Sequence, residues 1–573
     1  MDSKTKSSNK YLKGISWILN PVFWLWVAPL LLIAPNIALT VTEYNSVWAK
    51  ITNIALPLGI YGILFSLFRK IGRTILLFIP IMVFASLQIV LLALYGESII
   101  AIDMYVNILT TSVSEAKELL ENLFWAILVI LVLYLPLLSF GIYARIKKVY
   151  APIGPRRLLR KLSYFPLGLG VISFIFAIIF ADDFMPRREI FPYNVAENLV
   201  TAIRRTNTSM HYHNTSDKFT YSSVMMRDKT LPEVYVVVIG ETSRAMNWEL
   251  NGYNRPTNPK LKERQGIFTF PKVVSEINTT HKAVPMLLSY LEPENFGDSV
   301  AHTRSIFQAF NNIGYRTAFF SNQSRNHSYI DYYGKEAQFA EFLTDNGAGQ
   351  KDFDLIAEMN RIIESSPNNK VFIVLHTYGS HFEYRKRYPA EMAYFTPDVN
   401  STAHASNRNQ LLNAYDNTIR YTDALLDSII ESLDKLNVPT ALLYVSDHGE
   451  DIYDDDRERF LHSSPTPTAH QLNVPFIIWL SDEYNAQFPE IANGIKGNLD
   501  KNISSTGSLF HTILDVTGIK SPFYDASYSV ASPQFRERPR KYLNDYNESV
   551  PLWKSGLRDE DFAVFDSLKI SYR

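Results

Sequence analysis

The sequence predicts a protein of two parts, an N-terminal all-α transmembrane bundle of five helices and a C-terminal α/β domain with a mostly parallel sheet. Long apolar runs dominate residues 15–181, whereas short apolar runs alternate with helical patterns in the rest of the chain. Such alternation is typical of doubly wound sheets with helices on both faces. We expect 1–181 to be the membrane domain, 182–233 a connector and 234–573 the α/β domain.

Five apolar segments have about the 20 residues that a helix needs to cross a bilayer. They run from Ile15 to Ala34, Ile51 to Phe68, Thr74 to Tyr95, Leu123 to Tyr143 and Leu162 to Ala181. No small-residue cleavage site follows the first segment, so we interpret it as a retained anchor and not as a signal peptide.

Basic residues indicate the orientation of these segments. Arg and Lys gather in the loops after the second and fourth segments, whereas residues 35–50 and 96–122 carry only Lys50 and Lys117. Basic loops stay in the cytoplasm, so the chain after Ala181 lies outside, which in a bacterium with two membranes is the periplasm. The sequence therefore predicts a multi-pass inner-membrane protein with a periplasmic α/β domain.

The second outer loop carries polar residues at helical spacing. Asn107, Thr111 and Glu115 recur every four residues and would share one helix face. This face is either the solvated side of an interfacial helix or a site for a zwitterionic lipid headgroup. Further on, residues 194–205 have the pattern of an interfacial amphipathic helix, and the polar run 206–228 is expected to be a flexible linker.

Composition limits the classes of function. The chain has 56 basic and 57 acidic residues, so no global field favours nucleic acid as a partner. It contains no cysteine, which excludes disulfides, thiolate metal sites and a cysteine nucleophile. Exported proteins need not carry disulfides, so the compartment is left open by this count.

In the α/β domain, the predicted strands are Val234 to Ile239, Tyr315 to Phe320, Lys370 to Leu375, Thr440 to Val445 and Val474 to Leu480. The predicted helices are Ser305 to Asn312, Phe353 to Ser365 and Leu411 to Leu436.

Acidic residues directly follow two of these strands. Glu241 ends the first, and Asp447 with His448 ends the fourth. Open α/β sheets place their chemistry at the carboxyl ends of parallel strands, and carboxylate plus imidazole suits zinc. Taken alone, Glu241 is equally well explained as a helix N-cap or a solvated turn residue.

Other candidate site residues follow strands or lie in adjoining loops. His376 and His381 come after the third strand, and His462 lies in RFLHSSPTP. Each histidine by itself is more often structural than functional. Thr280, in NTTHKAVP, supplies a hydroxyl, with a plain helix cap as the alternative.

Together these motifs resemble the membrane-bound phosphoethanolamine transferases of the alkaline phosphatase and sulfatase superfamily, which modify lipopolysaccharide. The likeness covers nearly the whole chain: five spans, the polar face of the outer loop, GET and NGY, HTYGSHFEYRKRYP, and SDHGE with a downstream LH. SYSVASPQF and YRKRYP look closer to the branch that modifies the core heptose than to the lipid A branch.

The resemblance implies a role for each matching residue. The zinc ligands would be Glu241, Thr280, Asp447 and His448, with Thr280 also the nucleophile. The residues that bind the transferred phosphate or a second zinc would be His381 and His462, with His376 in the same segment. The donor-lipid contacts would be Asn107, Thr111 and Glu115. Family members often carry periplasmic disulfides, whereas this chain has none.

The implied reaction takes phosphoethanolamine from phosphatidylethanolamine, releases diacylglycerol and passes through a phosphothreonine-type intermediate to core heptose or lipid A. The product would weaken the binding of cationic peptides such as polymyxin. A monomer with one zinc, and room for a second, is expected. The alternatives are a lipoteichoic-acid-type glycerol-phosphate transferase and a catalytically silent membrane scaffold or sensor. A formylglycine sulfatase is disfavoured because the chain has no cysteine.

Overall fold

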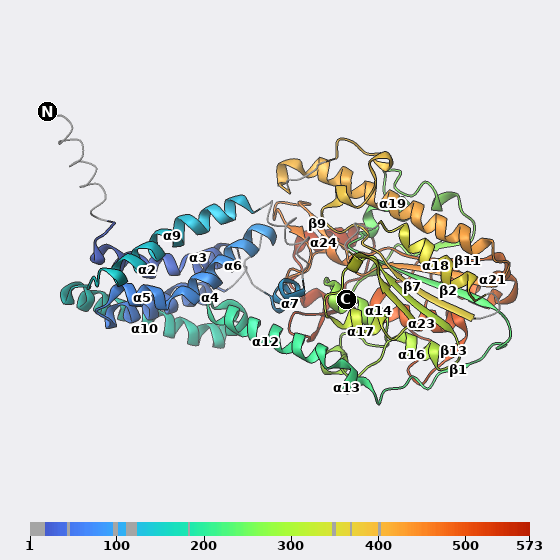
Figure 1. The fold of residues 1–573 in the computed structure, drawn as a ribbon, viewed down its shortest axis with the longest axis horizontal. Coiled ribbons are helices and arrows are strands. Elements are labelled where there is room, and N and C mark those ends of the chain that lie inside the picture. Colours follow the sequence, from blue (N-terminus) through green and yellow to red (C-terminus); the bar gives the residue numbers. More distant parts are fainter. Residues whose placement is uncertain are drawn as a thin grey trace. The chain divides into compact units, whose positions relative to one another are not determined.

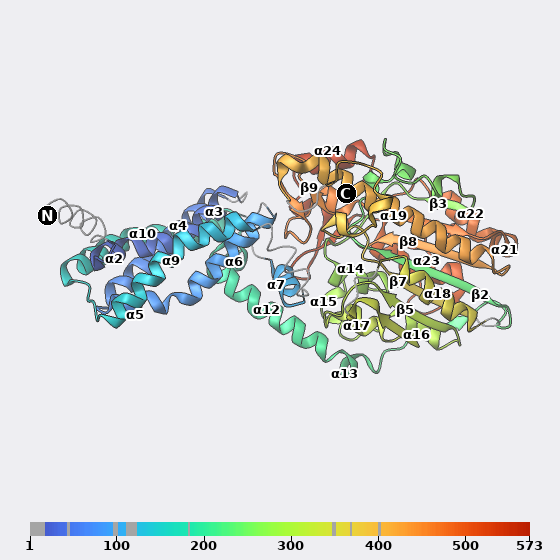
Figure 2. The same ribbon diagram turned by 45° about the horizontal axis from the view of Figure 1, so that its top comes forward.

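The computed structural model describes residues 18–42, 46–95, 101–110, 123–181, 184–346, 351–366, 370–398 and 403–573 (Figures 1 and 2). The chain divides into two compact units. Unit 1 comprises Met1–Tyr105 and Leu119–Ala202, and unit 2 comprises Val106–Glu118 and Ile203–Arg573.

Unit 1 is helical. Its helices include α2 (Pro21–Leu32), α3 (Ala34–Thr42), α4 (Val47–Leu67), α5 (Ile71–Leu77), α6 (Ile79–Tyr95), α9 (Phe124–Ile146), α10 (Ile153–Phe180) and α11 (Pro186–Glu189). Among the described residues, four helical stretches are long and apolar enough to cross a membrane, and the pair Ile71–Leu77 and Ile79–Ala93, bent by 47°, adds a fifth if it forms one span. The predicted membrane bundle is confirmed with four to five apolar spans, and its first span runs over Pro21–Val41, later than expected.

Small residues let α4 and α10 approach closely. A Cβ atom added at Gly59 would lie 2.5 Å from the backbone nitrogen of Leu167. A Cβ atom added at Gly62 would fall within van der Waals overlap of Ser163 Oγ. Helices in a bilayer associate through such small-residue contacts, because lipid is as apolar as the side chains themselves.

The connector is more ordered than the sequence suggested. Helix α12 (Tyr193–Met210) confirms the predicted helix and extends it, and α13 (Tyr212–Ser216) and β1 (Val224–Met225) follow. The prediction of a flexible linker over 206–228 is therefore wrong. Its two tyrosines explain why: Tyr212 and Tyr221 are buried, and their hydroxyls donate to the carbonyl oxygens of Thr303 and Arg304.

Unit 2 is built on a seven-stranded sheet with the order β3-β11-β8-β2-β7-β5-β6. The strands are β3 (Ile267–Thr269), β11 (Phe476–Leu480), β8 (Thr440–Ser446), β2 (Glu233–Gly240), β7 (Lys370–His376), β5 (Arg316–Ser321) and β6 (Phe339–Phe342). β11 runs antiparallel to both of its neighbours, β3 and β8, whereas the other strand pairs of this sheet are parallel. The mostly parallel sheet is confirmed, and the two edge strands that the sequence did not predict are short and only partly buried.

Helices cover both faces of this sheet (Figure 1). The largest apolar core joins one face to α16 (Ile306–Asn311) and α23 (Ser505–Thr517). The other face packs against α18 (Asp354–Glu364) and α19 (Arg408–Asp434). With helices on both faces, the interior strands β2, β7 and β8 are fully buried, which is why they read as continuous apolar runs.

The two edges of the sheet differ in chemistry. At the amino-terminal edge, Glu233 and Lys370 are register partners at the start of β2 and β7, and Nζ of Lys370 lies 3.1 Å from Oε2 of Glu233. The hydroxyls of Tyr235 and Tyr315 donate to the same oxygen. At the carboxyl edge, the loops after β8, β2, β7 and β5 carry the polar residues described next.

Candidate functional site

The ends of β2 and β8 lie side by side and bring the predicted ligands together. Gly240 is the register partner of Ser446, so Glu241 and Asp447 follow neighbouring strands at the same level. The backbone nitrogen of Asp447 donates to the carbonyl oxygen of Gly240 at 3.1 Å. The sheet itself therefore fixes the spacing between the loop that carries Glu241 and the loop that carries Asp447 and His448.

Thr280 points into this cluster from the first turn of α14 (Thr280–Leu287). Its Oγ1 lies 3.1 Å from Oε1 of Glu241 and 3.1 Å from Nε2 of His448. The residue at the N-cap position is Thr279, so the alternative of Thr280 as a plain cap does not describe this helix. Thr280 is partly exposed, which leaves its hydroxyl open to a ligand.

The carboxylates of the cluster are buried. Oδ1 of Asp447 accepts hydrogen bonds from the backbone nitrogens of Thr242 and His448. Oδ2 accepts no hydrogen bond and lies 3.2 Å from Nε2 of His448, on the side of the cluster. Burial, followed by the charge of Asp447, raises the pKa of Glu241 well above its usual range. A cation would offset both effects, and the donor set of two carboxylates, an imidazole and a hydroxyl fits zinc.

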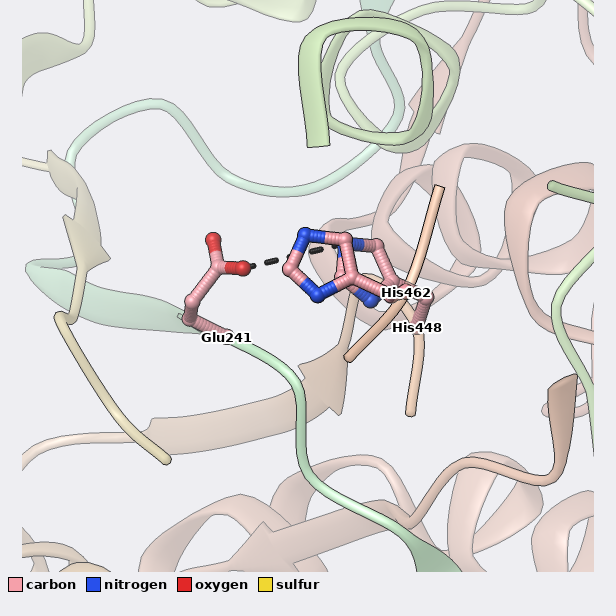
Figure 3. Close-up of side chains that lie close together, drawn as sticks. All are labelled: Glu241, His448 and His462. Atoms are coloured by element: carbon pink, nitrogen blue, oxygen red, sulfur yellow. Dashed lines mark ion pairs between the residues drawn. The ribbon is translucent and has the colours of Figure 1, made fainter. Parts of the chain in front are cut away.

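His462 joins the cluster from the loop after β10 (Phe460–Leu461). Figure 3 shows the carboxylate of Glu241 directed at the imidazoles of His448 and His462, whose ring centroids lie 4.2 Å apart. One ligand atom from each of the three lies within 4.8 Å of the others. Nδ1 of His462 lies 3.3 Å from Oε2 of Glu450, so the Nε2 atom is left for the cluster.

The surroundings of His462 shift the pKa values of two groups. Burial, and then the neighbouring His448, lowers the pKa of His462 well below its ordinary value. Burial also raises the pKa of Glu450 to about 8.

His381 lies beside His462, with ring centroids 6.0 Å apart, and its Nδ1 is 2.6 Å from the carbonyl oxygen of Phe382. His376 has a different place. It is buried as the last residue of β7, and its Nδ1 lies 3.1 Å from Ser321 Oγ. The described contacts thus bring His381 to the cluster and leave His376 within the sheet, where a role in substrate binding stays a prediction.

One residue of the predicted headgroup face also lies near His462. Asn107, in α7 (Ile102–Thr110), donates from Nδ2 to the hydroxyl oxygen of Ser463 at 3.1 Å. Ser463 directly follows His462, so Asn107 contacts the chain neighbour of a residue of the cluster. Thr111 and Glu115 lie outside the described residues.

Sequence reasoning missed two residues that contact predicted site residues. Glu450, in the SDHGE motif, faces His462, and Gln323, two residues after β5, donates from Nε2 to Oε2 of Glu241 at 2.8 Å. A signal for Gln323 was present, since the strand before it was predicted and its polar loop belongs to the same edge as the other loops.

A second acidic group lies nearby, formed by Asp451, Asp454 and His470. Arg244 and Arg408 pair with Asp454 at 2.7 and 2.9 Å, and the pKa of that carboxyl is held below its usual range despite its burial. Two guanidinium groups already supply the positive charge here, so we assign this group to structure and not to a metal.

Comparison with known proteins places this geometry in context. The family model described as Sulfatase matches residues 233–519, which includes Glu241, Thr280, Asp447 and His448. The phosphoethanolamine transferase EptA of Escherichia coli K12 is 30% identical over 314 residues, covering 53% of this chain and 56% of that protein. The chain thus spans about half the length of this curated relative.

Two solved structures extend the likeness. The integral membrane protein lipooligosaccharide phosphoethanolamine transferase A of Neisseria meningitidis superposes with a TM-score of 0.69 at 23% identity, covering 89% of this chain and 97% of that one. The C-terminal periplasmic domain of EptC from Escherichia coli, in complex with zinc, gives 0.51 at 26% identity, covering 57% and 94%. The first shows that the two-part fold is shared along the chain. With the family model matching half of its length, the chain belongs to the sulfatase family, and the phosphoethanolamine transferases are its relatives within that fold.

Proposed function

We propose that this chain transfers phosphoethanolamine from phosphatidylethanolamine to a lipopolysaccharide acceptor, core heptose or lipid A, through a covalent intermediate on Thr280. It acts as an inner-membrane protein whose α/β domain faces the periplasm, and we expect a monomer. The observation that carries the proposal is the position of Thr280 Oγ1, 3.1 Å from both Glu241 Oε1 and His448 Nε2. The names of the relatives support the transferred group and the class of acceptor.

One zinc ion would be held by Glu241, Thr280, Asp447 and His448. Oδ2 of Asp447 accepts no hydrogen bond and lies 3.2 Å from Nε2 of His448, and the pKa of Glu241 is raised. Both support this ligand set, because they indicate an acceptor-rich site that favours a cation. A bound zinc lowers the pKa of a hydroxyl ligand and stabilises charge on phosphoryl oxygens. His381 and His462 would bind the transferred phosphate or a second zinc.

In the first half of the reaction, the ionised oxygen of Thr280 attacks phosphorus and the bond to the diacylglycerol oxygen breaks. His462 donates the proton that this oxygen needs, from Nε2. Glu450 lies 3.3 Å from Nδ1 of the same ring, and this contact holds the ring so that Nε2 faces the cluster. His381, beside His462, lies where it can stabilise charge on the phosphoryl oxygens.

In the second half, an acceptor hydroxyl attacks the same phosphorus and the bond to Thr280 breaks. The acceptor proton passes to His462, which returns the ring to its starting state, and Thr280 leaves as it entered. Asn107, with Thr111 and Glu115, would contact the headgroup of the donor. The net reaction moves phosphoethanolamine from the donor lipid to the acceptor and releases diacylglycerol, and it needs no further reactant.

The test is intact-protein mass spectrometry of the detergent-purified full-length protein after incubation with phosphatidylethanolamine. We expect a mass increase of one phosphoethanolamine group in the wild type, its absence in Thr280→Ala and its persistence in the exposed control Thr208→Ala. Thr280→Ser keeps a hydroxyl and should keep the adduct. Chelation before the lipid is added should abolish it.

Other outcomes identify the alternatives. An adduct formed from phosphatidylglycerol instead would favour the glycerol-phosphate transferase. Absence of an adduct with either lipid, with zinc restored, would remove Thr280 as the nucleophile and favour a silent membrane scaffold or sensor.

A further inference from the structure

We propose that Gln323 is a positioning residue that decides which oxygen of Glu241 faces Thr280 and the metal site. This inference rests on the proposed function. The amide nitrogen of Gln323 donates to Oε2 of Glu241 at 2.8 Å and to the carbonyl oxygen of Thr377 at 3.0 Å. One carboxylate oxygen is thereby engaged, and the other, Oε1, is the one that lies 3.1 Å from Thr280 Oγ1.

The side chain of Gln323 spans two loops of the carboxyl edge. It follows β5, and the carbonyl oxygen that it contacts belongs to the residue after β7. The backbone nitrogen of Gln323 donates to Ser321 Oγ at 3.1 Å, which fixes the start of the side chain. The side chain of Gln323 is therefore fixed at its backbone and at its amide nitrogen, which contacts both Thr377 and Glu241.

A buried carboxylate keeps these two loops together. Asp352 accepts from the side chain of Asn322 at 2.7 Å and from the backbone nitrogens of Tyr378 and Gly379 at 2.8 and 3.0 Å. Asn322 precedes Gln323, and Gly379 lies against Glu241. The loop that carries the amide and the loop that carries its second acceptor are thus joined at one point beside the site.

The chemical type of Gln323 suits this task. An arginine or lysine in contact with Glu241 would neutralise the carboxylate and compete with a cation, whereas an amide orients the carboxylate without changing its charge. Partners of this kind commonly contribute about 10- to 100-fold to metal affinity.

The test measures zinc affinity of the full-length protein by competition with a chromogenic chelator. Gln323→Leu removes the donor at similar size, and Gln323→Asn shortens it. Gln338→Leu is the control, since the side chain of Gln338 donates to the carbonyl oxygen of Tyr315, away from the site. We expect the two Gln323 variants to bind zinc roughly 10- to 100-fold more weakly and the control to bind as the wild type.

A second measurement separates positioning from folding. The visible absorption of the cobalt(II)-substituted protein reports the ligand geometry, and it should change in Gln323→Asn and stay unchanged in Gln338→Leu. Melting of the chelated proteins shows whether each variant is folded, and if Gln323→Leu is not, Gln323→Asn carries the test alone.

Glu241→Gln distinguishes a failure of the role of Gln323 from a failure of the proposed metal site. If it weakens zinc binding while the Gln323 variants bind zinc with wild-type affinity and spectrum, this inference is overturned and the metal site stands. If Glu241→Gln itself leaves zinc binding unchanged, the proposed metal site fails, and the role of Gln323 fails with it.

Discussion

The Nζ atom of Lys370 lies 3.1 Å from Oε2 of Glu233, and both side chains are buried at the amino-terminal edge of the central sheet. We predict that Lys370→Met destabilises the protein by about 3–5 kcal/mol, because it leaves a buried carboxylate without its cation. The double variant Glu233→Gln/Lys370→Met should recover most of this loss. Denaturant unfolding of unit 2, followed by tryptophan fluorescence, measures both. Equal stability of the single and double variants would contradict the prediction.

Glu276 should make stability depend on pH. Burial raises the pKa of its carboxyl from 4.5 to about 7, although Thr506 and Gly507 donate hydrogen bonds to its Oε2 atom. Between those two values the folded state keeps a proton that the unfolded state releases, so stability falls as pH rises through this window. A shift of this size corresponds to about 3 kcal/mol. The contribution is therefore present below pH 4.5 and lost by about pH 7.

Glu276→Gln cannot ionise and should remove this dependence. Unfolding free energies of the wild type and the variant, measured from pH 4.5 to 7.5, should converge or cross because only the wild type loses the contribution. Glu560→Gln, at an exposed position, is the matched control and should follow the wild type. Parallel curves for the wild type and Glu276→Gln would exclude the proposed titration.

Gly379→Ala should damage the proposed zinc site through the backbone of Glu241. Gly379 has a φ of +53°, and an added Cβ would lie 2.8 Å from both the nitrogen and the carbonyl oxygen of Glu241. We expect a loss of stability of about 2 kcal/mol or more and reduced zinc content, because backbone atoms cannot yield as a flexible side chain would.

Gly314→Ala is the control for this backbone conformation. Gly314 also has a positive φ, of +88°, but nothing lies within 4 Å of an added Cβ. Its substitution should cost only the strain of the left-handed conformation and leave zinc content unchanged. Zinc loss of equal size in both variants would show that the contact with Glu241 is not the cause.

Removal of the proposed zinc ion should lower the melting temperature of the wild type. A ligand that binds only the folded state at 100 times its dissociation constant stabilises it by about 2.7 kcal/mol. Chelation should remove this stabilisation, and added zinc should restore it. Glu241→Gln, which lacks one of the four proposed ligands, should melt at nearly the same temperature with and without chelator. Differential scanning calorimetry of the detergent-solubilised protein makes the comparison.

The sequence predicted the parts of the fold that have strong patterns. The strands β2 and β8 are buried on both faces, so they read as continuous apolar runs with an acid at the end, and that pattern placed Glu241 and Asp447. The edge strands β3 and β6 are short and partly exposed, which leaves no such pattern. The sequence did not indicate that Tyr212 and Tyr221 are buried, because polar residues surround them in the chain.

The site shows the same division. Residues such as His448 and Thr280 could be identified as candidates because they lie in recognisable motifs. Gln323 has an ordinary side chain in a loop, and only the three-dimensional meeting of the loops after β5, β2 and β7 brings its amide to Glu241. The predicted strand that precedes His376 ended one residue early, so the sequence placed this histidine in a loop, whereas the structure holds it within β7.

The central sheet carries Lys370 and Glu233 at one edge and Glu241, Asp447 and Gln323 at the other. Evolution or engineering can therefore change the stability of the scaffold and the chemistry of the site through different residues. Substitutions at the first edge should move the melting temperature while activity per folded molecule stays constant, whereas substitutions in the opposite loops should change the activity of the folded molecule. A library that varies the carboxyl-edge loops while the residues of the amino-terminal edge are kept would search for new activities on an unchanged scaffold.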